Sequence, residues 1–146
     1  MAFSDYKNIS QVQKEFGIIY KEENFIGGQE TEPPDIFRKE FEFNREHMDI
    51  YTSEASRSEV IIFPVLREVW KNYSGICSFW IQKYMKFDEK LSGTPDYIIS
   101  ARSGLGKTVL EGPLLIAAEA KKNDFEQGWG QCLAELVASQ KINGSA

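Results

Sequence analysis

The sequence predicts an α+β fold, in which a small mixed β-sheet is flanked by helices within a single domain of 146 residues. Two observations predict this class. Apolar residues recur at helical spacing in the first half of the chain and again near its end, whereas a central stretch changes to the alternation that is typical of strands. Gly and Pro residues interrupt the chain where one pattern gives way to the next. The resulting order of helices, three strands and a helix predicts helices packed on a small sheet.

The first 52 residues are predicted to form an N-terminal helical layer. Ser10–Gln13 fits a capping box that opens a short helix, and Gly17 is placed to end it. A second helix is predicted from Pro34 to about Met48, because proline is favoured in the first turn of a helix. The remaining core is assigned to residues 53–141.

The core begins with a third helical region, from about Ser53 to Tyr73, which Pro64 is expected to kink or split. One face of this region carries residues at helical spacing, namely Ala55, Glu59, Ile62, Leu66 and Val69. Glu59 is the one charged residue on that face. We therefore expect its side chain to point inward, where a carboxylate needs a partner.

The centre of the chain predicts strands. Alternating apolar residues from Cys77 to Phe87 indicate a strand with one buried face, and the segments Tyr97–Ser100 and Leu114–Ala118 indicate two more. The Gly and Pro residues between these last two segments predict an antiparallel pair joined by a turn. A final helix is predicted over about 126–141, with Trp129 among the core residues of its apolar stripe.

Composition excludes several classes of protein. A hydrophobic content of 42% with 13% aromatic residues is typical of a folded globular domain. No apolar run is long enough to span a bilayer and no export signal is visible, so we expect a cytoplasmic protein without a membrane partner. A zinc site is excluded because His47 is the only histidine. The net charge of −5 argues against affinity gained by coating phosphates with basic side chains.

Acidic and basic residues stand where two predicted strands meet the edge of the core. Asp96 precedes the strand that begins at Tyr97, and Glu119 follows the apolar run that ends at Ala118. Residues two apart on a strand share a face, so Lys121 points the same way as Glu119. Two converging carboxylates make a hard oxygen site that suits Mg²⁺ or Mn²⁺. A lysine beside them can orient water or stabilise charge on a scissile phosphate.

Three segments carry a resemblance to a known superfamily. They are Gly93-Thr-Pro-Asp-Tyr97, Glu119-Ala-Lys-Lys122 and Gly128-Trp-Gly-Gln131. In this order they resemble the PD-(D/E)XK nuclease superfamily, and are most similar to small bacterial proteins related to restriction endonucleases and to the N-terminal domains of type I restriction subunits. The match runs from about residue 53 to residue 140. It implies a restriction-endonuclease-like core and Mg²⁺-dependent hydrolysis of phosphodiester bonds.

The resemblance also implies roles for individual residues. Asp96 and Glu119 correspond to the metal-binding acids of the superfamily, and Lys121 corresponds to its catalytic lysine. Glu59 matches the glutamate that members often carry on the helix before the first core strand, which makes it a third metal ligand. Gln131 matches the helix glutamine of several branches and would support the orientation of the attacking water.

The function expected from the sequence is therefore a metal-dependent nuclease acting on DNA, in restriction or repair. The alternative is a nuclease-like domain without turnover, serving nucleic-acid binding or protein assembly, which the acidic net charge favours. Members of the branch usually continue beyond the glutamine helix with further strands, whereas this sequence ends at Ala146. We therefore expect either a truncated core or a homodimer that pairs its exposed sheet edge with a second copy.

Overall fold

The elements follow the predicted order, and the α+β class is confirmed. The computed structural model describes residues 2–144, so the two ends of the predicted 1–146 domain (residues 1 and 145–146) lie outside the described residues. The helical elements are η1 (Phe3–Asp5), α1 (Ile9–Phe16), α2 (Asp35–His47), α3 (Glu54–Arg57), η2 (Ser58–Ile62), α4 (Phe63–Trp70), η3 (Lys71–Tyr73) and α5 (Phe125–Ile142). The strands are β1 (Cys77–Ile81), β2 (Met85–Lys86), β3 (Ser92–Gly93), β4 (Tyr97–Arg102) and β5 (Leu110–Ala118).

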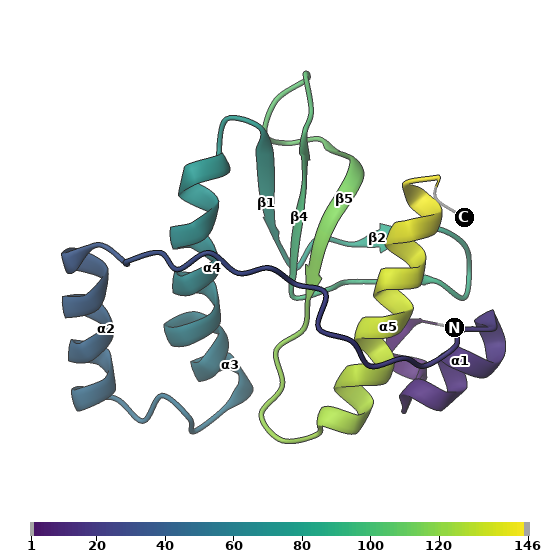
Figure 1. The fold of residues 1–146 in the computed structure, drawn as a ribbon, viewed down its shortest axis with the longest axis horizontal. Helices are drawn as coiled ribbons and strands as arrows, with labels where there is room; N and C mark the ends of the chain where they lie inside the picture. Colours follow the sequence, from purple (N-terminus) through teal and green to yellow (C-terminus); the bar gives the residue numbers. More distant parts are fainter. Residues whose placement is uncertain (1, 145–146) are drawn as a thin grey trace.

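The main sheet has the strand order β1-β4-β5 and lies between α4, which contacts β1, and α5, which contacts β5 (Figure 1). Both pairings in this sheet are antiparallel, so the predicted mixed sheet is wrong in this respect. A parallel pair would need a crossover connection. The chain between β1 and β4 instead forms the small antiparallel pair β2–β3, and β4 returns directly into β5 through residues 103–109.

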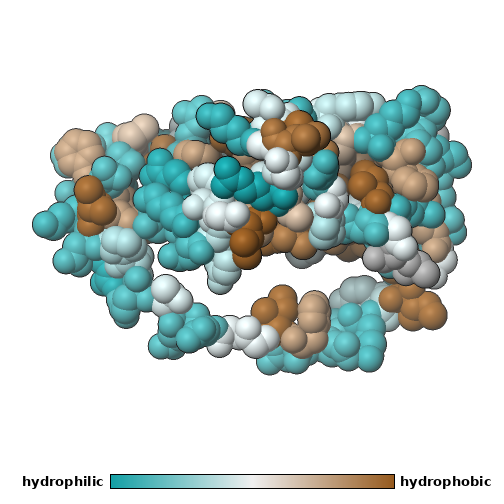
Figure 2. All heavy atoms as spheres, turned by 90° about the horizontal axis from the view of Figure 1, so that it is seen from above, coloured by the Kyte–Doolittle hydropathy of each residue, from teal (hydrophilic) through white to brown (hydrophobic). Residues whose placement is uncertain are grey.

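The two N-terminal helices do not form one layer. Helix α1 begins after Asn8, whose side chain accepts a hydrogen bond from the Gln11 N–H, and ends at Gly17, which has a φ of 66°. It packs against α5, whereas α2 contacts η2 on the other side of the molecule (Figure 1). The exposed segment 18–34 connects them across the front of the sheet, and it stands away from the body of the molecule in Figure 2.

The third helical region is split as expected, but the break also changes its register. Pro64 lies in the first turn of α4, and the turn before it, η2, is a π-helix. A proline cannot donate the hydrogen bond that would continue an α-helix, and a π-helical turn holds more residues than an α-helical one. The face expected from a uniform 3.6-residue period is therefore lost: Ala55, Glu59 and Val69 are all exposed.

Helix α5 packs through its small residues. Ala134 and Ala138 are fully buried, and a side chain at Gly130 would meet the backbone of Asn8 at 2.8 Å. Small residues allow the backbones of α1 and α5 to approach closely, which leaves the bulky residues on the other face in solvent. The prediction that Trp129 belongs to the core is therefore wrong, because its side chain is 63% exposed.

The core lies between α1, α5 and the sheet. Its largest fully buried apolar side chains are Phe3, Val12, Leu91 and Ile98. In residues 2–144, no helix combines the length and apolar character needed to cross a membrane. The packing of α5 against β5 brings the middle of the helix to the end of the sheet where β4 begins and β5 ends.

Candidate metal centre

The register of β4 and β5 places Asp96 beside Glu119, as the sequence predicts. Tyr97 of β4 pairs with Ala118 of β5. Asp96, which precedes Tyr97, and Glu119, which follows Ala118, therefore face each other at the same end of the sheet. The Asp96 carboxylate accepts a hydrogen bond from the Ala120 N–H, with an O–N distance of 2.7 Å. This contact fixes the chain as it leaves β5 and holds the Glu119 side chain next to Asp96.

Lys121 completes the predicted group. Its Nζ lies 3.8 Å from Oε2 of Glu119, and the two side chains are only 20% and 5% exposed. The lysine stem runs against α5, where a side chain at Gly128 would meet its Cγ at 2.8 Å. Arg57 of α3 donates a hydrogen bond to the Lys121 carbonyl at 3.3 Å, while the buried Nε of the same arginine has no acceptor. Two basic side chains, Lys121 and Arg57, therefore lie beside the carboxylates of Asp96 and Glu119, which are called the acidic group below.

A further acid, Glu135, reaches the same place from α5. Its side chain is fully buried, and as an ionised carboxylate it finds no hydrogen-bond donor for either oxygen. A proton on one of the two glutamates, Glu119 or Glu135, would let them bond to each other. Oε1 of Glu119 is also buried without a partner. Buried polar atoms are rarely left unpaired, because losing contact with water without a replacement costs about 1–3 kcal/mol for each group. Three unpartnered oxygens at one point therefore mark a place that is completed by a proton, an ion or a ligand.

The sequence contains a signal for Glu135 that pattern analysis missed. Gln131, Ala134, Glu135 and Ala138 fall at helical spacing on one face of α5, and this is the face that packs inward. A glutamate among alanines on a buried face would have identified it. The small residues beside Gln131 were expected to let α5 approach the sheet closely, but Glu135 was not recognised on that face.

The two glutamates are held in different protonation states. Burial raises the pKa of Glu135, and the adjacent Glu119 carboxylate raises it further, so Glu135 keeps its proton at neutral pH. Burial also raises the pKa of Glu119, but the hydrogen bond with Glu135 and the charge of Lys121 oppose that shift. The proton of the pair therefore belongs on Glu135. Burial and the same two acids raise the pKa of the neighbouring Cys132 thiol to about 11, so it stays protonated.

Gln131 joins this group and Glu59 does not. The Gln131 side chain, one turn before Glu135 on α5, lowers the pKa of that carboxyl and so lies against it. Glu59 is exposed on the π-helical turn η2, and its charge acts on the hydroxyl of Tyr97, whose pKa it raises after the larger effect of burial. The expectation that Glu59 points into the core is therefore wrong. Its cause is the register change at Pro64.

The donor atoms fit a hard divalent cation. They are the carboxylate oxygens of Asp96 and Glu119, of which Oε1 of Glu119 is buried and unpartnered, and the nearby Cys132 thiol is not ionised. Within the described range 2–144, no three His, Cys, Asp or Glu side chains are already arranged around one point as a metal cage. Mg²⁺ is commonly held by one or two carboxylates together with water and substrate phosphate, so Asp96 and Glu119 are the residues that would hold it.

Comparison of the chain with protein-family models, with curated proteins and with solved structures finds no match.

Proposed function

We propose that the protein is a divalent-metal-dependent nuclease that hydrolyses phosphodiester bonds in DNA. One observation carries this proposal: the buried oxygens of Glu119 and Glu135 lack hydrogen-bond donors at the end of the sheet where Lys121 is also held. The ion pair with Lys121 reaches only Oε2 of Glu119. The other oxygens therefore need a proton, which Glu135 supplies in the proposed mechanism, and a cation beside Glu119. The Pro-Asp and Glu-x-Lys pattern of the PD-(D/E)XK superfamily supports nucleic acid as the substrate.

In the proposed mechanism, each residue of the group has a separate task. Asp96 and Glu119 hold Mg²⁺ or Mn²⁺, which when bound supplies positive charge to a phosphate in the site. Lys121 donates from Nζ to the phosphate oxygens that gain charge in the transition state, and to the attacking water. Glu59, exposed on η2, has no task in this mechanism.

Glu135 acts through Glu119. A protonated Glu135 donates its hydrogen bond to the Glu119 carboxylate, which keeps Glu119 ionised and fixed in orientation for the cation. Gln131 lies against Glu135 and holds that carboxyl in place. Both are positioning residues in this scheme, and the carboxylate that touches the cation is Glu119.

We also propose that the protein forms a homodimer through β5. Among residues 2–144 this strand pairs with β4 alone, and Leu115 and Ile116 on it are about half exposed. Asn143 already binds both backbone groups of Leu114, accepting from its N–H at 2.7 Å and donating to its carbonyl at 2.8 Å. We therefore expect the second copy to pair its own β5 with the part of this strand that follows Leu114.

The nuclease is tested by cleavage of supercoiled plasmid and of single-stranded DNA in Mg²⁺, Mn²⁺ or chelator. We expect cutting that requires the metal and falls by at least about 100-fold in Asp96→Ala, because that carboxylate both holds the cation and fixes the chain at Ala120. Glu126→Gln is the matched control, since this exposed acid lies on the first turn of α5 and takes no part in the group.

The same assay separates the proposal from its main alternative, a nuclease-like domain without turnover. The absence of a ready-made three-ligand cage within the described residues favours that alternative. Metal binding without cleavage of either DNA in any metal would establish it and refute the nuclease. Equal loss of cleavage in Asp96→Ala and Glu126→Gln would refute the assignment of the site.

A further inference from the structure

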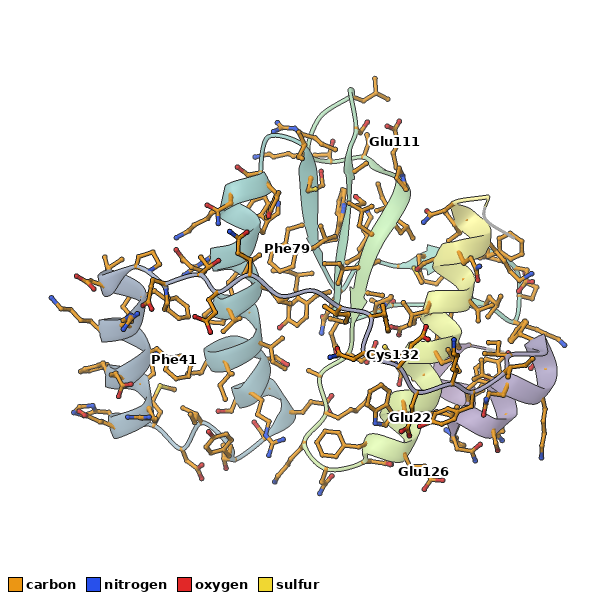
Figure 3. All side chains as sticks on the ribbon, viewed as in Figure 1. Glu22, Phe41, Phe79, Glu111, Glu126 and Cys132 are labelled. Carbon is orange, nitrogen blue, oxygen red and sulfur yellow. The ribbon has the colours of Figure 1, made fainter. Side chains whose placement is uncertain are left out.

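A pocket of about 310 Å³ opens directly beside the acidic group. Glu119 and Lys121 form one wall, and α5 forms the other with Phe125, Trp129 and Cys132. In Figure 3, the labelled Cys132 marks the side of α5 that faces the chain leaving β5, and Glu126 marks the beginning of the helix. The volume is at the lower end of the range of about 300–1,000 Å³ that is usual for ligand pockets. It suits one small ring system.

The aromatic wall of the pocket is not needed by the core. Phe125 and Trp129 are 54% and 63% exposed and lie four residues apart, so they are neighbours on one face of α5. The core contacts of the helix come from other residues, among them Gly130, Ala134, Val137 and Ala138. Two large aromatic side chains therefore stay in solvent at the mouth of a pocket. It is their place at the mouth of a pocket, beside Glu119 and Lys121, that makes them candidates for ligand contact.

The position of the pocket limits what can enter it. Lys121 contributes to the wall through its stem, and Arg57 adds positive charge next to it. When the phosphate of a nucleotide contacts Lys121, the base of that nucleotide can therefore reach the pocket. A base in a duplex must first be unpaired and unstacked, at a cost of a few kcal/mol, so a base that is already unpaired enters such a pocket most easily.

The net charge leads to the same class of substrate. At −5, the protein gains little affinity from general attraction to phosphates, which dominates binding to duplex DNA. Stacking on aromatic side chains is the other main source of affinity for nucleic acid, and every base can supply it. Stacking on the aromatic wall of the pocket can therefore supply the affinity that the net charge of the protein does not supply.

We propose that the pocket takes an unpaired nucleobase next to the scissile phosphate, stacked on Trp129 and Phe125, which makes single-stranded DNA the substrate class. The inference rests on the proposed nuclease for the position of the phosphate. The base-binding step itself needs only the pocket and the aromatic wall.

The test measures binding of fluorescently labelled oligothymidine by anisotropy in the presence of chelator, so that nothing is cleaved. We expect Trp129→Ala to weaken binding about tenfold, and Trp129→Phe to keep most of the affinity, because phenylalanine also stacks. Phe43→Ala is the matched control, since Phe43 is a similarly exposed aromatic residue (61%) on α2. Thermal unfolding of each variant verifies that it is folded.

A second probe is an abasic oligonucleotide of the same length. We expect wild type and Trp129→Ala to bind this probe with the same weak affinity, because the probe has no base to stack. The proposal is overturned if Trp129→Ala binds oligothymidine as wild type does, if the abasic probe shows the same loss, or if duplex DNA is bound more tightly than the single strand.

The nuclease and the base pocket fail separately in these experiments. Base-dependent binding at Trp129 without metal-dependent cleavage would support the pocket and refute the nuclease. Metal-dependent cleavage whose KM for single-stranded DNA is unchanged in Trp129→Ala would support the nuclease and refute the pocket.

Discussion

Replacing Lys121 with alanine is expected to lower the kcat of DNA cleavage by about 100- to 1,000-fold. The ammonium group lies at the mouth of the acidic group, 3.8 Å from Glu119, where it meets charge that develops on the phosphate. It is not a metal ligand, so affinity for Mn²⁺ should stay the same or increase once a neighbouring positive charge is removed. Single-turnover cleavage and a separate metal titration measure the two effects.

Lys122→Ala is the matched control for this variant. The two lysines are adjacent, but Lys122 is exposed and Lys121 is held against Gly128. We expect Lys122→Ala to cleave within a few-fold of wild type, with any loss appearing in KM and decreasing at higher salt. Equal kcat in Lys121→Ala and wild type would remove the lysine from the mechanism.

The stability of the metal-free protein is expected to carry an unusual pH dependence that comes from Glu135. Burial raises the pKa of this carboxyl in the folded state above its ordinary value of 4.5. Below the ordinary value both states are protonated and the contribution to stability is complete. As pH rises toward the folded-state pKa, the unfolded chain gives up its proton first, so stability falls, by at most about 1.4 kcal/mol for each pH unit.

Urea unfolding in chelator, between about pH 5 and pH 8, measures this contribution. The difference in unfolding free energy between wild type and Glu135→Gln isolates the Glu119–Glu135 pair, because the carboxyl groups that do not contact this pair cancel. We expect Glu135→Gln to become increasingly stable relative to wild type as pH rises, and Glu126→Gln to show no such trend. A difference that does not change with pH would mean that Glu135 is ionised in the folded protein, and its proposed hydrogen bond to Glu119 would be wrong.

The antiparallel sheet and the grouping of Asp96, Glu119 and Lys121 follow from local sequence patterns. Strands have a side-chain period of two, and the turn between 103 and 109 joins neighbouring segments, so the antiparallel pairing of β4 with β5 could be predicted. That pairing places Asp96 beside Glu119, and the spacing of Glu119 and Lys121 puts them on one side. The predicted ends of α1, α2 and α5 agree within one or two residues with the structure. Gly17 marks the end of α1 and Pro34 the beginning of α2, whereas α1 begins after Asn8 rather than at the capping box expected at Ser10.

The rest depended on contacts that no local pattern contains. A uniform helical period assigned Glu59 to the interior, but the π-helical turn before Pro64 moves it into solvent. Hydrophobicity assigned Trp129 to the core, but the close approach of Asn8 to Gly130 makes the small residues of α5 the buried face. Glu135 differs from these two residues, because its place among the small residues of α5 is a local signal that was not used.

The central claim is that Glu119 holds a divalent cation, and calorimetric titration of Mn²⁺ into wild type and Glu119→Gln tests it most directly. We expect wild type to bind one ion, with an observed heat that depends on the buffer as protons are released from the acidic group. In Glu119→Gln, which keeps the shape of the side chain and removes its charge, binding should weaken by at least about tenfold. Glu126→Gln should bind as wild type does. Equal Mn²⁺ affinity in Glu119→Gln and wild type would contradict the account, whatever DNA cleavage shows.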